Sequence, residues 1–163
     1  MLKIIDDLKP FFENCYARVN VRQYARLMKI SPPTASSLLK GCEKDGLLVK
    51  EMDRNYIMFH TNRKSQEFIM MSRIYWQRRL GSLVKSIDAD SIVLFGSLSK
   101  AETNLESDID LAIFGGKKTN LEKFEKELKR EIHAFWFDSL HDANKELRNN
   151  IINGHVLSGR LGL

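Results

Sequence analysis

Asp108 and Asp110 are the residues of this chain whose type and spacing most directly predict chemistry. They lie in the segment SDIDLAIF, where the alternation of a strand would place both carboxylates on one face and Ile109, Leu111 and Ile113 on the other. Carboxylates at that spacing are roughly 7 Å apart, so together they can bind divalent cations, whereas without a counter-charge they repel. The pair predicts a Mg²⁺ site, and two solvated acids at the start of a strand are the alternative.

A Gly-Ser pair, Gly96 and Ser97, precedes the aspartates and ends the apolar run Ile92–Phe95. The run is typical of a buried strand, and the glycine permits another group to approach the backbone closely. If Ser97 begins a short helix, its free amide groups and hydroxyl form a pocket suited to phosphate oxygens. With two cations, such a pocket would align a nucleophilic oxygen, an α-phosphate and a leaving pyrophosphate for in-line displacement.

In its segments FGS and DIDL the sequence resembles the minimal nucleotidyltransferases of the DNA polymerase β superfamily. The signature of that family is an apolar residue, Gly-Ser, about ten residues, and then Asp-x-Asp between apolar residues. The resemblance covers about residues 64–163, and the closing KELRNNIINGHVLSG is similar to the family's last helix and tail. It implies NTP as substrate, Mg²⁺ or Mn²⁺ as cofactor, and two groups of binding residues: Gly96, Ser97 and Lys100 for the triphosphate, and Asp108 and Asp110 for the metal ions.

Active members of that family usually carry a third carboxylate on a later strand, where it completes the metal site and takes the proton of the acceptor hydroxyl. The segment TNLEKFEKELKR predicts the intervening helix, with Thr119 and Glu122 as a capping box. The strand then follows as EIHAFWFDS. By its apolar flanks, the position expected to be acidic is His133.

Three interpretations of this departure remain open. Glu131 shares a strand face with His133, so a shift of register would supply the missing carboxylate, whereas Asp138 falls on the opposite face unless a bulge intervenes. Alternatively, His133 itself serves as ligand or base, although imidazole favours softer metals than Mg²⁺. In the third interpretation catalysis has been lost and the pocket only binds a nucleotide, or nothing.

The N-terminal third predicts two helices followed by a hairpin. Asn20 and Gln23 resemble a capping box that opens the first helix, whose apolar side would include Leu27. The second helix is expected from Pro33 to about Lys44, and the runs LLVKEM and YIMFH form the hairpin.

This order resembles the winged-helix domains of prokaryotic transcription regulators over roughly residues 1–62. If the resemblance holds, the second helix enters the major groove of DNA, and the hairpin tip contacts phosphate or the minor groove. A module for protein contacts or dimerisation is the alternative, and a homodimer is one expected arrangement because winged helices commonly act as dimers. The candidate DNA-binding residues are Thr34, Ser36, Ser37, Lys40 and Arg54.

Charge is distributed unevenly along the chain. The net charge is +5, but residues 1–88 carry 16 Lys and Arg against 9 Asp and Glu, and residues 89–163 carry 10 against 12. A basic N-terminal half suits a polyanion such as DNA. No apolar stretch approaches the roughly 20 residues that span a bilayer, and the early acids do not suit a signal peptide, so we expect a cytoplasmic protein without a membrane partner.

We therefore predict an α+β fold with two domains. Residues 1–62 would form the winged helix-turn-helix, and residues 63–163 a small mixed-sheet nucleotidyltransferase domain opened by a long helix at about 64–87. The expected function is Mg-dependent transfer of a nucleoside monophosphate from NTP to an unidentified acceptor, either a protein or a nucleic acid. A non-catalytic, nucleotide-sensing transcription regulator and an antitoxin-like partner of a small helical toxin are the alternatives.

Overall fold

The computed structural model describes residues 2–162, and the chain divides into two compact units. The N-terminal unit runs to Ser72 and also includes the loop Ala101–Leu105. The C-terminal unit holds Arg73–Lys100 and the chain from Glu106 onward. The division falls within helix α5 (Gln66–Arg79), and the boundary predicted at residue 62 lies ahead of that helix.

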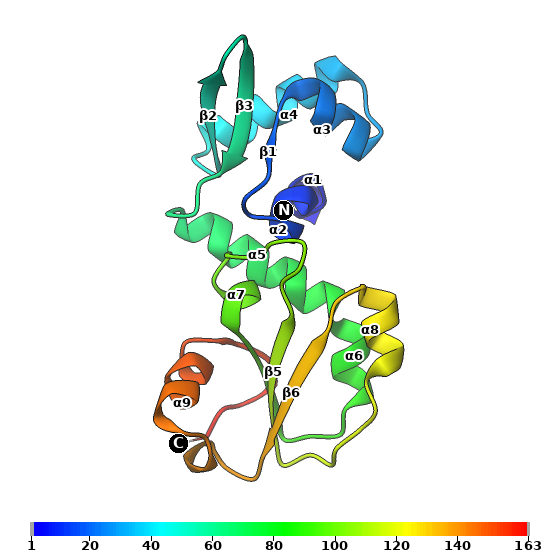
Figure 1. The fold of residues 1–163 in the computed structure, drawn as a ribbon, viewed down its shortest axis with the longest axis vertical. Helices are drawn as coiled ribbons and strands as arrows, with labels where there is room; N and C mark the ends of the chain where they lie inside the picture. The colour runs from blue at the N-terminus through cyan, green and yellow to red at the C-terminus, as the bar shows by residue number, and fades with distance from the viewer. Residues whose placement is uncertain (1, 163) are drawn as a thin grey trace. The chain divides into compact units, whose positions relative to one another are not determined.

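The N-terminal unit contains helices and a three-stranded antiparallel sheet of order β1-β3-β2 (Figure 1). The hairpin β2–β3 has the position expected from the sequence, whereas the two-residue strand β1 was not predicted. The elements before α5 are α1 (Leu2–Asp7), α2 (Lys9–Glu13), β1 (Arg18–Val19), α3 (Val21–Met28), α4 (Pro32–Lys44), β2 (Leu48–Asp53) and β3 (Tyr56–Thr61).

Helix α3 begins at the predicted capping box, which the structure confirms. The Asn20 side chain accepts the Gln23 N–H at 2.9 Å, and the Gln23 side chain accepts the Asn20 N–H at 2.9 Å. The expectation that Leu27 is buried is wrong, since its side chain is 60% exposed. Tyr24 and Ala25 define the buried face of the helix, and Leu27 lies well away from it.

Helix α4 begins one residue earlier than expected. Ser31 is its N-cap and its hydroxyl accepts the Thr34 N–H at 3.3 Å, with Pro32 in the first turn where no amide hydrogen is needed. Helix, turn, helix and hairpin therefore follow one another in the predicted order.

The C-terminal unit is built on a four-stranded mixed sheet of order β6-β5-β4-β7. β5 and β6 are parallel and run side by side in Figure 1, while β4 is antiparallel to both β5 and β7. Its elements after α5 are α6 (Gly81–Ser86), β4 (Ser91–Phe95), α7 (Gly96–Ser99), β5 (Ile109–Phe114), α8 (Glu122–Leu128), β6 (Ile132–Phe137), the 3₁₀ turn η1 (Leu140–Asp142), α9 (Lys145–Ile152) and β7 (His155–Gly159).

Three expectations for this unit need correction. The single long helix at about 64–87 is in fact α5 and α6, which are separated at Leu80, next to a glycine that disfavours a helix interior. The Thr119 and Glu122 capping box does not form, because the side chain of Asn120 accepts the Glu122 N–H instead, at 2.9 Å. Part of the predicted tail is strand β7, which pairs with β4.

Every side chain of β4 is buried, and in β5 every side chain except that of Asp110 is buried. One face of the sheet packs against the chain around η1 and α9, in a cluster formed by Val93, Phe95, Ala112, Phe114, Leu140, Ala143 and Ile151. Within residues 2–162, none of the helices combines the length and the apolar character needed to cross a membrane.

Candidate active site

The Gly-Ser turn and the second aspartate lie against each other. β4 ends at Phe95, which pairs with Asp110 of β5, and Gly96 follows with φ +70. A Cβ atom built on Gly96 would overlap Oδ2 of Asp110 and lie 3.2 Å from its Cγ. Glycine is therefore required here both by the left-handed backbone and by the carboxylate that occupies the space above it.

Ser97 and Lys100 follow this turn in and after the short helix α7. Ser97 is half-buried, and its carbonyl accepts the Lys100 N–H at 3.2 Å. The Lys100 amine is exposed and lies 3.4 Å from the side-chain oxygen of Asn150 in α9. Both predicted phosphate-binding residues are thus at the turn, although Lys100 contacts a neutral amide in this structure.

Asp108 directly precedes β5 and Asp110 is its second residue, at the end of the sheet where the glycine turn lies. Their side chains are 40% and 26% exposed, so both are open to solvent but partly enclosed. Ile109 between them is buried, as the strand alternation predicted. The apolar cluster on this face of the sheet includes Ala112 of β5 and Phe95, the partner of Asp110, but not Asp110 itself. The carboxylate therefore lies at the edge of the apolar cluster.

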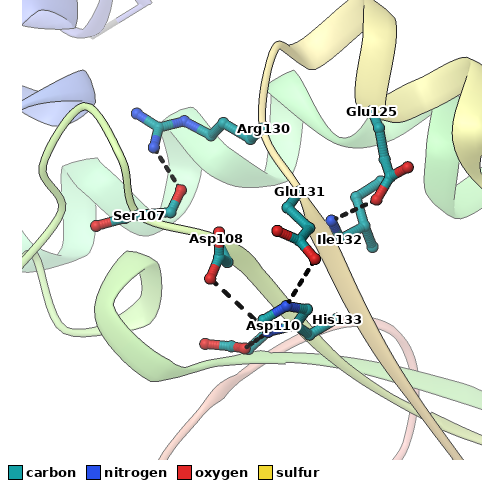
Figure 2. Close-up of polar contacts among 8 residues, drawn as sticks. All are labelled: Ser107, Asp108, Asp110, Glu125, Arg130, Glu131, Ile132 and His133. Carbon is teal, nitrogen blue, oxygen red and sulfur yellow. Dashed lines mark hydrogen bonds and ion pairs between the residues drawn. The ribbon is translucent and has the colours of Figure 1, made fainter.

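His133 lies directly beside this pair. The parallel register of β5 and β6 places it opposite Asp110, as the alignment of the apolar flanks predicted. Its Nδ1 is 3.5 Å from Oδ1 of Asp110 and 3.8 Å from Oδ2 of Asp108 (Figure 2). The predicted third position of the site is therefore in contact with both aspartates.

Glu131, which directly precedes β6, contacts the other nitrogen of the His133 ring. Its Oε1 is 3.3 Å from Nε2 of His133, and its side chain is 68% exposed (Figure 2). It thus touches the imidazole rather than filling the position of a third carboxylate. Asp138 follows the opposite end of β6 and is not part of this group.

The neighbouring side chains shift the pKa values of His133 and Asp110. Burial lowers the pKa of His133, but the hydrogen bond that the ring donates to Glu131 and the negative charges of Asp108, Glu131 and Asp110 outweigh it, so the pKa is raised above its ordinary value. Burial and the neighbouring Asp108 raise the pKa of Asp110, against the lowering effect of His133. In the protein alone, His133 is thus the basic group that lies beside the two aspartates.

Arg130 holds the chain immediately before the aspartates. Its guanidinium donates to the carbonyl of Ser107 at 2.6 Å (Figure 2). The same guanidinium lies over the Trp76 ring, 5.4 Å from the centroid. Since Arg130 is 9% exposed, this hydrogen bond is shielded from water. No motif or spacing in the sequence links Arg130 to Ser107.

The start of β6 is fixed in a similar way. The Ile132 N–H donates to Oε1 of Glu125 in α8 at 2.9 Å, and the Ile109 N–H donates to the carbonyl of Glu131 at 2.9 Å. The first bond ties β6 to α8, and the second joins β5 to β6 in the register in which His133 pairs with Asp110.

The donor set fits a divalent cation. Two carboxylates on one strand face adjoin a glycine turn, and carboxylate oxygen is the ligand that Mg²⁺ and Mn²⁺ accept. Among residues 2–162, no three His, Cys, Asp or Glu side chains already stand at the spacing of a ready-made metal site. Binding of a cation would therefore require these partly exposed side chains to rotate toward one another.

The candidate DNA-binding residues lie in the N-terminal unit. On α4, Thr34, Ser37 and Lys40 are exposed and Ser36 is half-buried. Arg54, in the turn between β2 and β3, is exposed and has φ +54.

The same hairpin carries acidic side chains. Glu51 and Asp53 of β2 lie 2.5 Å and 3.7 Å from the guanidinium of Arg18. This ion-pair group reduces the repulsion that the two acids would exert on a phosphate backbone.

Residues 81–160 match the family model described as Polymerase beta, Nucleotidyltransferase. The matched range includes the glycine turn, both aspartates and His133, and it supports a nucleotidyltransferase domain in this part of the chain. The N-terminal helices and the hairpin lie outside it. A comparison of the sequence with curated proteins finds no match.

Proposed function

We propose that the C-terminal unit transfers a nucleoside monophosphate from an NTP to an acceptor hydroxyl, with Mg²⁺ or Mn²⁺. The observation that carries this proposal is the packing of the Asp110 carboxylate over Gly96, which brings a metal-binding side chain to a turn suited to phosphate. The family match over residues 81–160 supports the same reaction class.

Each residue of the turn has a separate part in binding. Gly96 allows the triphosphate to approach the backbone, and the amide and hydroxyl of Ser97 donate hydrogen bonds to phosphate oxygens. Lys100 adds positive charge once its amine leaves Asn150. Asp108 and Asp110 hold the divalent cations, which when bound neutralise phosphate charge and align the attacking and leaving oxygens.

The reaction balances as a displacement at the α-phosphorus. A bond forms from the acceptor oxygen to that phosphorus, the bond to the bridging oxygen of the β-phosphate breaks, and pyrophosphate leaves. The hydroxyl proton passes to Glu131 or His133, the two proton acceptors beside the aspartates. The acceptor itself is a protein or a nucleic acid.

Labelling with α-labelled NTPs tests this proposal. With Mg²⁺ or Mn²⁺ present, we expect label to appear on an acceptor in the presence of the wild-type protein and to be lost with Asp110→Asn. Asp138→Asn is the matched control, because it neutralises a carboxylate at the other end of β6. Transfer that survives in Asp110→Asn would refute the assignment of the site.

For the N-terminal unit, we propose DNA binding by a winged helix. The support is the excess of basic residues in the N-terminal half, the order of helices and hairpin, and the exposure of Thr34, Ser37 and Lys40 on α4. In this arrangement α4 enters the major groove and Arg54 contacts the backbone or the minor groove.

A second candidate function is a nucleotide-sensing regulator without turnover. The specific observation in its favour is His133, which stands where a carboxylate base is expected and pairs with both aspartates. Losing such a base costs about 10²–10⁴ in rate, whereas phosphate binding would survive. Metal-dependent nucleotide binding without label transfer, together with salt-dependent DNA binding, would favour the regulator.

A further inference from the structure

We propose that His133 is itself a metal ligand, through Nδ1, and that it makes the site prefer a divalent transition metal such as Mn²⁺ over Mg²⁺. This inference rests on the proposed function, since it concerns the cation that Asp108 and Asp110 hold.

The first argument for this role is the position of the His133 ring. Nδ1 is the ring atom that faces both aspartates, at 3.5 Å from Asp110 and 3.8 Å from Asp108. Neighbouring ligands of an octahedral ion, at about 2.1 Å from the metal, are about 3 Å from each other. The two distances from Nδ1 to the carboxylate oxygens are thus within about 1 Å of that spacing, and the His133 side chain is 44% exposed.

The second argument is the contact between Glu131 and the His133 ring. A histidine that binds a metal through one nitrogen usually donates its other ring N–H to a carboxylate, which fixes the tautomer and increases the basicity of the ligating atom. Oε1 of Glu131 lies 3.3 Å from Nε2, the ring nitrogen that does not face the aspartates. With the proton on Nε2, the lone pair of Nδ1 points toward Asp108 and Asp110.

The chemistry of the donors decides the metal. Replacing a carboxylate by a neutral imidazole removes one negative charge from the site, and Mg²⁺, which gives up its water reluctantly, depends strongly on charged oxygen ligands. Mn²⁺ accepts the same carboxylate and phosphate oxygens and also binds imidazole nitrogen. The site therefore loses more affinity for Mg²⁺ than for Mn²⁺.

Titration of the full-length protein with Mn²⁺ alone, followed by electron paramagnetic resonance and by competition with Mg²⁺, tests the inference. In the wild-type protein, pulsed measurements should detect coupling between the bound Mn²⁺ and a directly bound ¹⁴N nucleus. In His133→Asp that coupling should vanish, and the ratio of Mn²⁺ to Mg²⁺ affinity should fall by about tenfold or more. Glu131→Gln should weaken Mn²⁺ binding by about tenfold or more.

His141→Gln is the matched control, because this exposed histidine lies in η1. It should keep the ¹⁴N coupling and the wild-type affinity ratio.

Three outcomes separate this inference from the proposed function. Loss of ¹⁴N coupling in His133→Asp with the expected change of ratio supports it. Bound Mn²⁺ without ¹⁴N coupling, at an affinity ratio that His133→Asp leaves unchanged, overturns it while leaving the aspartate site intact. Mn²⁺ binding that Asp110→Asn does not weaken removes the metal site from the proposed function, and the inference fails with it.

Discussion

The carboxylate of Asp110 occupies the space into which any side chain on Gly96 would project. The two residues are fourteen positions apart in the sequence, and the pairing of β4 with β5 brings them together. The contact ties the conformation of the turn to the direction of the aspartate.

Gly96→Ala should therefore damage both stability and binding. The left-handed backbone alone costs roughly 1–2 kcal/mol for a residue with a Cβ, and the overlap forces Asp110 to move. We expect the free energy of unfolding, measured with urea, to fall by at least about 1 kcal/mol, and metal-dependent nucleotide binding to weaken. Gly81→Ala is the control: a Cβ there meets no atom within 4 Å, so stability should stay the same or rise by about 0.5–1 kcal/mol.

Arg130→Met should loosen the chain in front of Asp108. The substitution keeps an apolar chain near Trp76 but removes the donor to Ser107, a hydrogen bond from a charged group that is worth about 1.5–3 kcal/mol. Urea unfolding should show a loss of that order, and cation affinity should drop with it. Lys126→Met, at an exposed position of α8, should change neither; equal effects of both substitutions would contradict the positioning role.

Acid should destabilise the C-terminal unit through His155. Burial, and then the charge of Arg73, lower the pKa of this ring, and its Nε2 has no hydrogen-bond partner among the described residues. In the unfolded chain the ring takes up a proton below about pH 6.5 while the folded protein resists protonation, so stability falls as the pH decreases, by up to about 1.4 kcal/mol per unit.

Urea unfolding from pH 8 to pH 5 of the wild-type protein and His155→Gln measures this contribution. The raised pKa of His133 acts in the opposite direction in both proteins, so it cancels in the difference. We expect the variant to lose less stability than the wild type below pH 6.5. If the free energy of unfolding falls by the same amount in both proteins between pH 8 and pH 5, His155 is not the source of the pH dependence.

DNA binding should depend on salt through α4 and the hairpin. Each phosphate contact adds about one to the slope of log affinity against log salt, so Lys40→Ala and Arg54→Ala should each reduce the slope by about 1. Lys85→Ala, which removes an exposed lysine of α6, should leave it unchanged. Equal slopes in all three variants would contradict the proposal that α4 and the hairpin contact DNA.

Periodicity and turn chemistry were sufficient to predict the elements around the site. The apolar run before Gly96 and the alternation around Asp110 predicted two strands and one shared face, and apolar flanks aligned His133 with the expected third position. These signals are local, which is why they can be recognised in a single sequence. A bend at Gly81 was expected from the sequence, but not a complete break at Leu80, because apolar residues continue at helical spacing on both sides of it.

Contacts between distant segments were not predictable in the same way. Arg130 donates to a backbone carbonyl, and such a bond leaves no signature in residue type. The loop Ala101–Leu105, which lies between the glycine turn and the aspartates in the sequence, belongs to the N-terminal unit, where the Cys15 N–H donates to the Thr103 carbonyl at 2.7 Å. Strand β7 is short and lies in the segment that resembles the family's tail after its last helix. Only its pairing with β4 identifies this segment as a strand.

Calorimetric titration with a nonhydrolysable NTP, with and without Mn²⁺, tests the central claim most directly. Nucleotide should bind the wild-type protein in the presence of the cation and at least about tenfold more weakly without it, because the aspartates otherwise repel the phosphates. Asp110→Asn should lose most of this metal dependence. No binding heat in the wild type, or an affinity that neither the cation nor the substitution changes, would contradict a phosphate and metal site at Gly96 and Asp110.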